Sequence, residues 1–226
     1  MDIQNKNRKL LKKNHVYHEN MEHDACGVGL VASTEGLKSR KVVEYGIEAL
    51  KAVWHRGAID ADGKTGDGAG IHIEIPNDFF AEKIEITGHE HDNSDLCVGM
   101  IFLPRNDFGG QEQCRSIVES ELTKKNFNIY GWRQVPVDPS VLGEKAEQTR
   151  PEITQVLFTH NDKSIHGKDL ERALYETRRK IEKEALRNQL NNFYICSFSS
   201  KSIIYKGMFL AESLSDFYPD LKDERF

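Results

Sequence analysis

The chain has 226 residues, of which 38% are hydrophobic and 30% are charged, and its formal net charge is −5. This composition lies outside the range of disordered chains, and its acidic balance provides no general attraction to nucleic acid. No apolar run is long enough to cross a membrane and the N-terminus lacks the apolar core of a secretory signal, so we expect neither a membrane nor a nucleic-acid partner.

The first third of the chain predicts a leader, a strand, a helix and a second strand. Residues 1–22 are polar and basic, and residues 25–33 (ACGVGLVAS) are short and apolar, which predicts a buried strand. Residues 39–54 predict a helix with Ser39 as N-cap and Gly57 as stop. Its predicted inward face consists of Val42, Tyr45, Gly46, Ala49, Leu50 and Val53. Residues 68–76 alternate isoleucine with polar residues, which is typical of a half-buried strand.

The remaining two thirds alternate apolar strands with amphipathic helices. The pattern predicts helices at 76–84, 109–126 and 168–190, and strands at 96–104, 127–137, 152–160, 191–200 and 201–209. The last two strands are joined by a tight Ser-Ser-Lys turn, residues 138–151 are expected to be a surface connection, and residues 210–221 a final helix or turn. The order of these elements indicates one α+β or layered α/β domain.

The glycine-rich stretch HRGAIDADGKTGDGAG, residues 55–70, does not fit the common ion-binding loops. A phosphate-binding P-loop would need glycine where Ala58 stands, and an apolar strand before it instead of a helix. A calcium loop would need an oxygen ligand at Lys64 and glycine at Thr65. We therefore expect these glycines to serve a sharp turn from helix to strand, and we expect no metal site in the chain.

The four cysteines are widely separated and form no CxxC pair, which favours reduced thiols in a cytoplasmic protein. Cys97, Cys114 and Cys196 lie in apolar strands or on a helix face and are expected in the core. Cys26 is open to two interpretations. It is a small buried hydrophobe, or it is a nucleophile whose pKa is lowered by a nearby cation or helix terminus.

Three segments carry a specific family resemblance. EHDACGVGLVA, KAVWHRGAIDADGKTGDGAGI and YKGMFLAESLSDFYPDL follow one another between residues 22 and 221. In this order they resemble the amino-terminal glutamine amidotransferase region of the glutamate synthase large subunit. The resemblance implies a class II amidotransferase with the N-terminal-nucleophile hydrolase fold, a four-layer αββα sandwich that is incomplete in this chain.

The resemblance implies that Cys26 becomes the first residue after residues 1–25 are removed as a propeptide. Residues 26–226 are then the N-terminal part of a type 2 glutamine amidotransferase domain, whose C-terminal part and synthase domains are absent from this chain. The chemistry agrees, because a freed Cys26 carries a thiol and an α-amine that can take the thiol proton. While Ala25 is attached, that nitrogen is an amide and cannot act as a base.

The resemblance also assigns supporting roles to Arg56 and Gly57. The guanidinium of Arg56 is expected near the nucleophile, where its fixed charge favours the thiolate. A cation at the end of the preceding helix, interacting with the helix dipole, is the alternative interpretation. The implied substrate is L-glutamine, and ammonia then passes to 2-oxoglutarate at a flavin site. FMN, a 3Fe-4S cluster and a small NAD(P)H-oxidising subunit are implied for the full-length family protein, with no cofactor in this segment.

Two motifs of the family are missing. An arginine that clamps the glutamine carboxylate and an Asn-Gly that builds the oxyanion hole would both follow residue 221, and no Asn-Gly occurs in the chain. We therefore expect the isolated chain to have negligible glutaminase activity. The alternatives are another class II amidotransferase, of purine or amino-sugar synthesis, and a non-catalytic structural module of the same fold.

Overall fold

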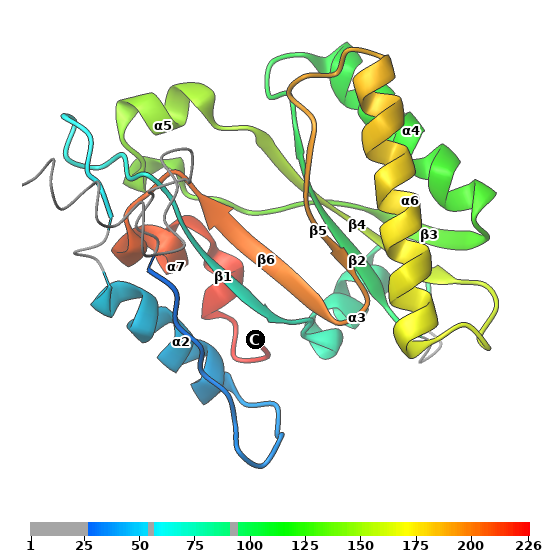
Figure 1. The fold of residues 1–226 in the computed structure, drawn as a ribbon, viewed down its shortest axis with the longest axis horizontal. Helices are drawn as coiled ribbons and strands as arrows, with labels where there is room; N and C mark the ends of the chain where they lie inside the picture. The colour runs from blue at the N-terminus through cyan, green and yellow to red at the C-terminus, as the bar shows by residue number, and fades with distance from the viewer. Residues whose placement is uncertain (1–26, 54–56, 91–94) are drawn as a thin grey trace, which may run out of the picture.

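The computed structural model describes residues 27–53, 57–90 and 95–226, in which helices surround antiparallel strands (Figure 1). The predictions for residues 1–25, Cys26 and Arg56 concern residues outside these described ranges. The longer elements are α2 (Arg40–Ala52), β1 (Ala69–Glu74), α3 (Asn77–Ile86), β2 (Cys97–Leu103), α4 (Phe108–Lys124), β3 (Phe127–Gln134), β4 (Glu152–His160), α6 (Gly167–Arg187), β5 (Tyr194–Ser199) and β6 (Ser202–Gly207). The short ones are η2 (Pro139–Val141), α5 (Glu144–Thr149), η3 (Ala211–Ser213), α7 (Leu214–Phe217) and η4 (Pro219–Lys222).

A four-stranded sheet in the order β3-β4-β2-β5 forms the larger half of the fold, and its neighbouring strands are antiparallel. β2 is buried along its length, which confirms the prediction of a central strand. Its side chains alternate, as a strand requires: Cys97 and Ile101 pack with helices α4 and α6, and Met100 packs in the other cluster. Figure 1 shows α4 and α6 lying together over this sheet.

A second, two-stranded sheet pairs β1 with β6, and Ile71 stands opposite Tyr205. β5 and β6 follow each other across the predicted tight turn, yet they belong to different sheets. The turn is held by Glu171 of α6, whose carboxylate accepts bonds from the Ser200 backbone N–H at 2.7 Å and from the Ser199 hydroxyl at 3.0 Å. The chain therefore crosses from one sheet to the other at this point.

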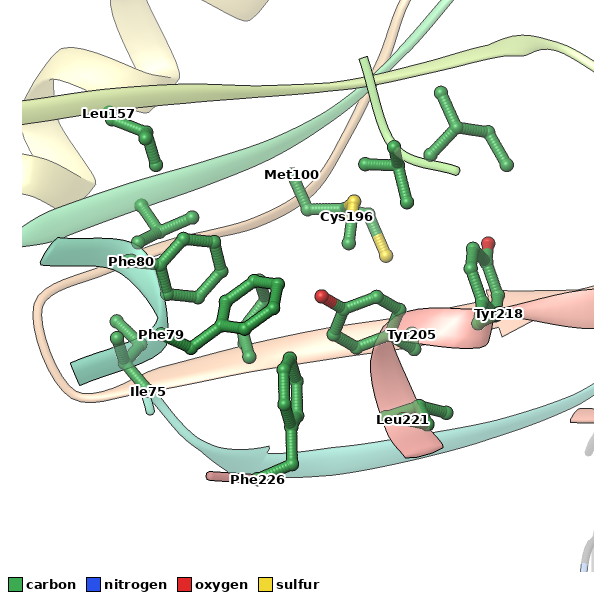
Figure 2. Close-up of a cluster of buried hydrophobic side chains, with 14 of the residues drawn as sticks. Ile75, Phe79, Phe80, Met100, Leu157, Cys196, Tyr205, Tyr218, Leu221 and Phe226 are labelled. Carbon is green, nitrogen blue, oxygen red and sulfur yellow. The ribbon is translucent and has the colours of Figure 1, made fainter. Parts of the chain in front are cut away.

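The main core lies where the two sheets and the C-terminal segment meet. Figure 2 shows Met100, Leu157 and Cys196 of the four-stranded sheet directed toward Tyr205 of β6 and the aromatic residues around it. Tyr205 stacks edge-on against Tyr218, with ring centroids 5.0 Å apart. This aromatic packing explains why the segment after β6, with its short helices, is an integral part of the core.

A buried polar network fixes the C-terminal segment to both sheets. Asp220 accepts two bonds of 2.7 Å from the guanidinium of Arg133 on β3 and one of 3.1 Å from the Tyr205 hydroxyl. Arg133 also donates to Gln155 of β4 at 2.8 Å, and Gln155 donates to the Tyr205 hydroxyl at 3.1 Å. Each of these buried polar groups is thus paired, as burial requires.

The predicted α+β class is confirmed as a mixture of helices and antiparallel sheets, but some local predictions are wrong. Residues 27–33 form no strand and pair with none of the described strands, and Val28 and Leu30 are 90% and 92% exposed. Tyr45 is exposed, since α2 packs through Val43 and Ile47 together with the predicted Leu50. The predicted surface connection 138–151 is largely exposed or half-buried as expected, and it contains η2 and α5, which were not predicted.

Candidate functional site

The described residues place the surroundings of the predicted nucleophile but not the nucleophile itself. Cys26 and Arg56 lie outside the described residues, whereas Gly27 lines two cavities. Gly57 is exposed and lies near the beginning of the glycine-rich stretch, residues 55–70. It does not stop the helix as predicted, because α2 ends at Ala52 with Val53 as its C-cap.

The first cavity, of about 660 Å³, opens where the two sheets diverge. Residues 67–72, Ile204 and residues 206–209 form one wall, and Phe102 and Tyr194 contribute from the four-stranded sheet. Residues 149–151, at the end of α5, close another side. This mostly apolar volume is within the size range of small-molecule sites and adjoins the residue that follows Cys26.

Two cations line this cavity, and both are already partnered. Arg150 donates to Glu147 at 2.7 Å, and Lys206 donates to the Tyr194 hydroxyl at 2.7 Å while lying 4.5 Å from the centre of its ring. The sequence analysis did not single out either cation. Neither cation belongs to a local sequence motif. Arg150 is the C-cap of α5 and Lys206 lies on β6, so only the folded chain brings them to one cavity.

The second cavity, of about 840 Å³, lies on the other side of Gly27. It is bounded by residues 27–31, by α2 and β1, and by the C-terminal residues 224–226. Gly46 of α2 lies so close to β1 that an added Cβ would be 3.3 Å from Ile71. The segment after Cys26 therefore lines the second cavity, and Gly27 lines both cavities, without a strand partner among the described residues.

The glycine-rich stretch forms a tight hairpin over residues 58–67. Ile59 and Gly66 form an antiparallel bridge, and the Asp67 N–H donates to Ala58 at 3.2 Å. Gly66 packs against the end of β6, where a Cβ would lie 2.6 Å from the Phe209 carbonyl oxygen. The interpretation of these glycines as a turn is consistent with this geometry, and the close approach to β6 adds a steric reason.

Asp62 organises the tip of the hairpin. Its carboxylate accepts the backbone N–H groups of Lys64 and Thr65 at 2.9 and 2.7 Å and the Thr65 hydroxyl at 2.5 Å. These bonds, first that from the Thr65 hydroxyl, hold the pKa of Asp62 well below its ordinary value of 3.8. The tip is thereby fixed with Thr65 turned inward and 2% exposed.

The hairpin tip docks on the beginning of α5. The Ala146 N–H donates to the Thr65 hydroxyl at 3.4 Å, and Lys145 forms a 2.6 Å ion pair with Asp60. At Gly143, a Cβ would lie 2.6 Å from the Thr65 nitrogen and closer still to the side-chain oxygens of Asp62 and Thr65. This contact was not predicted, although the sequence shows the Asp-x-x-Thr spacing of a side-chain-capped turn at Asp62 and Thr65.

The three described cysteines are core residues, as predicted. Burial raises the pKa of Cys97 well above its ordinary value and those of Cys114 and Cys196 to about 11. They are free thiols divided between two separate clusters. An iron–sulfur cluster needs converging thiolates, so these residues do not fit one.

Within residues 27–53, 57–90 and 95–226, no group of three or more His, Cys, Asp or Glu side chains is arranged to hold a metal ion. In the same ranges, no helix has both the length and the apolar character needed to cross a bilayer.

Comparison with known proteins gives consistent matches. The family model "Glutamine amidotransferases class-II" matches residues 26–226. The chain is 56% identical over 210 residues to the glutamate synthase [NADPH] large chain of Azospirillum brasilense, covering 93% of this chain and 14% of that protein. It is 38% identical over 203 residues to ferredoxin-dependent glutamate synthase 2 of Synechocystis sp., covering 89% of this chain and 13% of that protein. The chain thus spans about 14% of the length of the curated relatives it matches.

Proposed function

Because this chain belongs to the class-II glutamine amidotransferases, we propose that it is the amino-terminal part of the glutaminase domain of a glutamate synthase. The observation that carries the proposal is the family match over residues 26–226, together with relatives that are glutamate synthases. The alternative amidotransferases of purine or amino-sugar synthesis receive no support from these relatives. A non-catalytic role remains the competing hypothesis for the isolated chain.

The proposed nucleophile is Cys26, and residues 1–25 are the proposed propeptide. Removal of the propeptide frees the α-amine, which takes the thiol proton. The sulfur attacks the side-chain carboxamide carbon of glutamine, the C–N bond breaks, and ammonia leaves with a proton from the amine. Water then hydrolyses the γ-glutamyl thioester and restores the thiol. The start of the family match at Cys26 supports this assignment.

Arg56 and Gly57 are proposed as supporting residues. A guanidinium near the sulfur stabilises the thiolate, and the turn at Gly57 leads from α2 into the hairpin. The buried Cys97, Cys114 and Cys196, whose raised pKa values keep them protonated, are poor competitors for the nucleophilic role. The cavity beside Gly27 is the proposed approach for glutamine.

The finer fold proposed is the four-layer αββα sandwich of N-terminal-nucleophile hydrolases, incomplete in this chain. In support, one hydrophobic cluster lies between the four-stranded sheet and helices α4 and α6, and a second lies between that sheet and the β1–β6 pair. Helix α2 packs against β1 on the far side of the molecule from α4 and α6 (Figure 1).

For the whole protein, we propose a cytoplasmic enzyme in which ammonia is passed to 2-oxoglutarate for reductive glutamate synthesis. FMN and a 3Fe-4S cluster would belong to its other domains, and a small NAD(P)H-oxidising subunit is the proposed partner. The greater identity to the NADPH type than to the ferredoxin type supports that partner.

The function is tested by replacing Cys26 with alanine in the whole protein. We expect C26A to lose glutamine-dependent glutamate synthesis while synthesis from added ammonium continues, because ammonium bypasses the first half-reaction. The isolated chain should release no measurable ammonia, since loss of an oxyanion donor alone costs roughly 10²–10³-fold in turnover. Equal loss of both syntheses, or none, in C26A would contradict the proposal.

A further inference from the structure

The hairpin 58–67 links Gly57 to the cavity-lining residues at the beginning of β1. Gly57 immediately precedes it, and residue 57 follows Arg56 in the sequence. Asp67 and Gly68, at its other end, line the cavity that Gly27 also lines. The hairpin therefore follows the proposed thiolate-stabilising cation in the sequence, and its far end forms part of the cavity wall.

The hairpin is fixed by a set of residues that we name the hairpin latch. It consists of Asp62 and Thr65 at the hairpin tip and of Gly143, which lies outside the hairpin. Inside the hairpin, the Asp60 N–H donates to the Thr65 carbonyl at 2.9 Å, and Asp62 ties Thr65 to the tip. Outside it, the Thr65 hydroxyl accepts the Ala146 N–H of α5. Gly143 has an ordinary φ of −75°, so its role is steric: only a residue without a side chain allows this approach.

We propose that the hairpin latch positions the groups that carry out glutamine hydrolysis, and that Asp62, Thr65 and Gly143 are positioning residues for this reaction. None of the three needs to touch glutamine. They hold the hairpin against α5, whose end at residues 149–151 forms another wall of the same cavity. This inference rests on the proposed function, because it concerns how the site of that reaction is held.

The test is made on the whole protein with Gly143→Ala, compared with Gly109→Ala on α4. Both changes add one methyl group, but at Gly109 the nearest atom would be 3.6 Å away, which is ordinary contact. We expect G143A to lower kcat for glutamine hydrolysis about 10–100-fold, since small displacements of reacting groups have effects of this size. G109A should match the unmodified protein, and ammonium-dependent synthesis should be unchanged in both.

A second readout separates positioning from a general structural role. The pH dependence of Cys26 alkylation reports its thiol pKa, which should rise by about 1–3 pH units in G143A if the cation is displaced. Thr65→Val and Thr65→Ser provide an independent pair, because valine keeps the shape without the hydroxyl and serine restores the hydroxyl. T65V should resemble G143A and T65S the unmodified protein, which decides the question even if G143A does not fold.

Different results would refute the proposed function and the positioning role of the hairpin latch. If the unmodified protein hydrolyses no glutamine, or C26A still does, the proposed function is wrong. If both behave as expected but G143A equals G109A and T65V equals T65S, in kcat and in thiol pKa, the hairpin latch has no positioning role.

Discussion

Replacing Asp220 by alanine tests whether the buried network holds the C-terminal segment onto the sheets. The side chains of Asp220 and Arg133 are only 5% and 14% exposed, and the change removes two bonds from Arg133 and one from Tyr205. It leaves a guanidinium nearly buried without its counter-ion, which costs about 3–5 kcal/mol. Against a typical total stability of about 5–15 kcal/mol, this is a large fraction.

The assay is thermal unfolding followed by circular dichroism, in which D220A should lower Tm by about 6–20 °C. Asp216→Ala is the matched control on the same segment, because Asp216 pairs with Lys222 while both side chains are 57% exposed. An exposed pair contributes less than about 1 kcal/mol. The double change Arg133→Met with Asp220→Leu should recover much of the loss. Equal effects of D220A and D216A would refute the reasoning.

Three further predictions concern packing, thiol reactivity and pH. Gly99→Ala should destabilise the chain by about 1–3 kcal/mol in denaturant unfolding, because a Cβ on β2 would lie 2.7 Å from the Phe198 ring and 2.8 Å from Val156; an unchanged midpoint would contradict this. Cys97, Cys114 and Cys196 should resist alkylation at pH 8 until the protein is denatured, and mass-spectrometric detection of rapid labelling in the native protein would disprove their burial. The Asp62 carboxyl has a lowered pKa in the fold, so its contribution to stability is present above the ordinary value of 3.8 and is lost as pH falls through the lower folded pKa. Carboxyl NMR titration should find its midpoint well below 3.8, and a midpoint at that value would mean that the hairpin tip is not organised as described.

Most of the secondary structure was predictable because it depends on local periodicity. The alternation of Ile71 and Ile73 with polar residues predicted β1, and the spacing of Leu170, Leu174 and Ile181 predicted α6. These segments pair a strong pattern with burial on one face, so tertiary contacts reinforce what the sequence already favours.

The wrong predictions occur where long-range contacts decide. Residues 27–33 have the composition of a strand but pair with none of the described strands. Tyr45 fits a helical apolar face, yet α2 turns Ile47 to the core. The two strands and tight turn predicted for β5 and β6 are present, but the sequence did not predict that these strands enter different sheets.

Cys26, Arg56 and Gly57 were predicted as site residues from the family resemblance. The family itself is confirmed, and the roles of these residues stay predictions. The hairpin latch was not predictable, because Thr65 and Ala146 are 81 residues apart and no pattern in one sequence links them. For the same reason, Arg150 and Lys206 were not predicted to line the cavity, since they are far apart in the sequence.

The most direct test of the central claim is to treat the mature whole protein with a glutamine-mimicking diazoketone or chloroketone and map the modified peptide. The account predicts that the labelled residue is Cys26, that it is the first residue of the polypeptide, and that its α-amine is free. A label on another side chain, or an active protein that still carries residues 1–25, would contradict it.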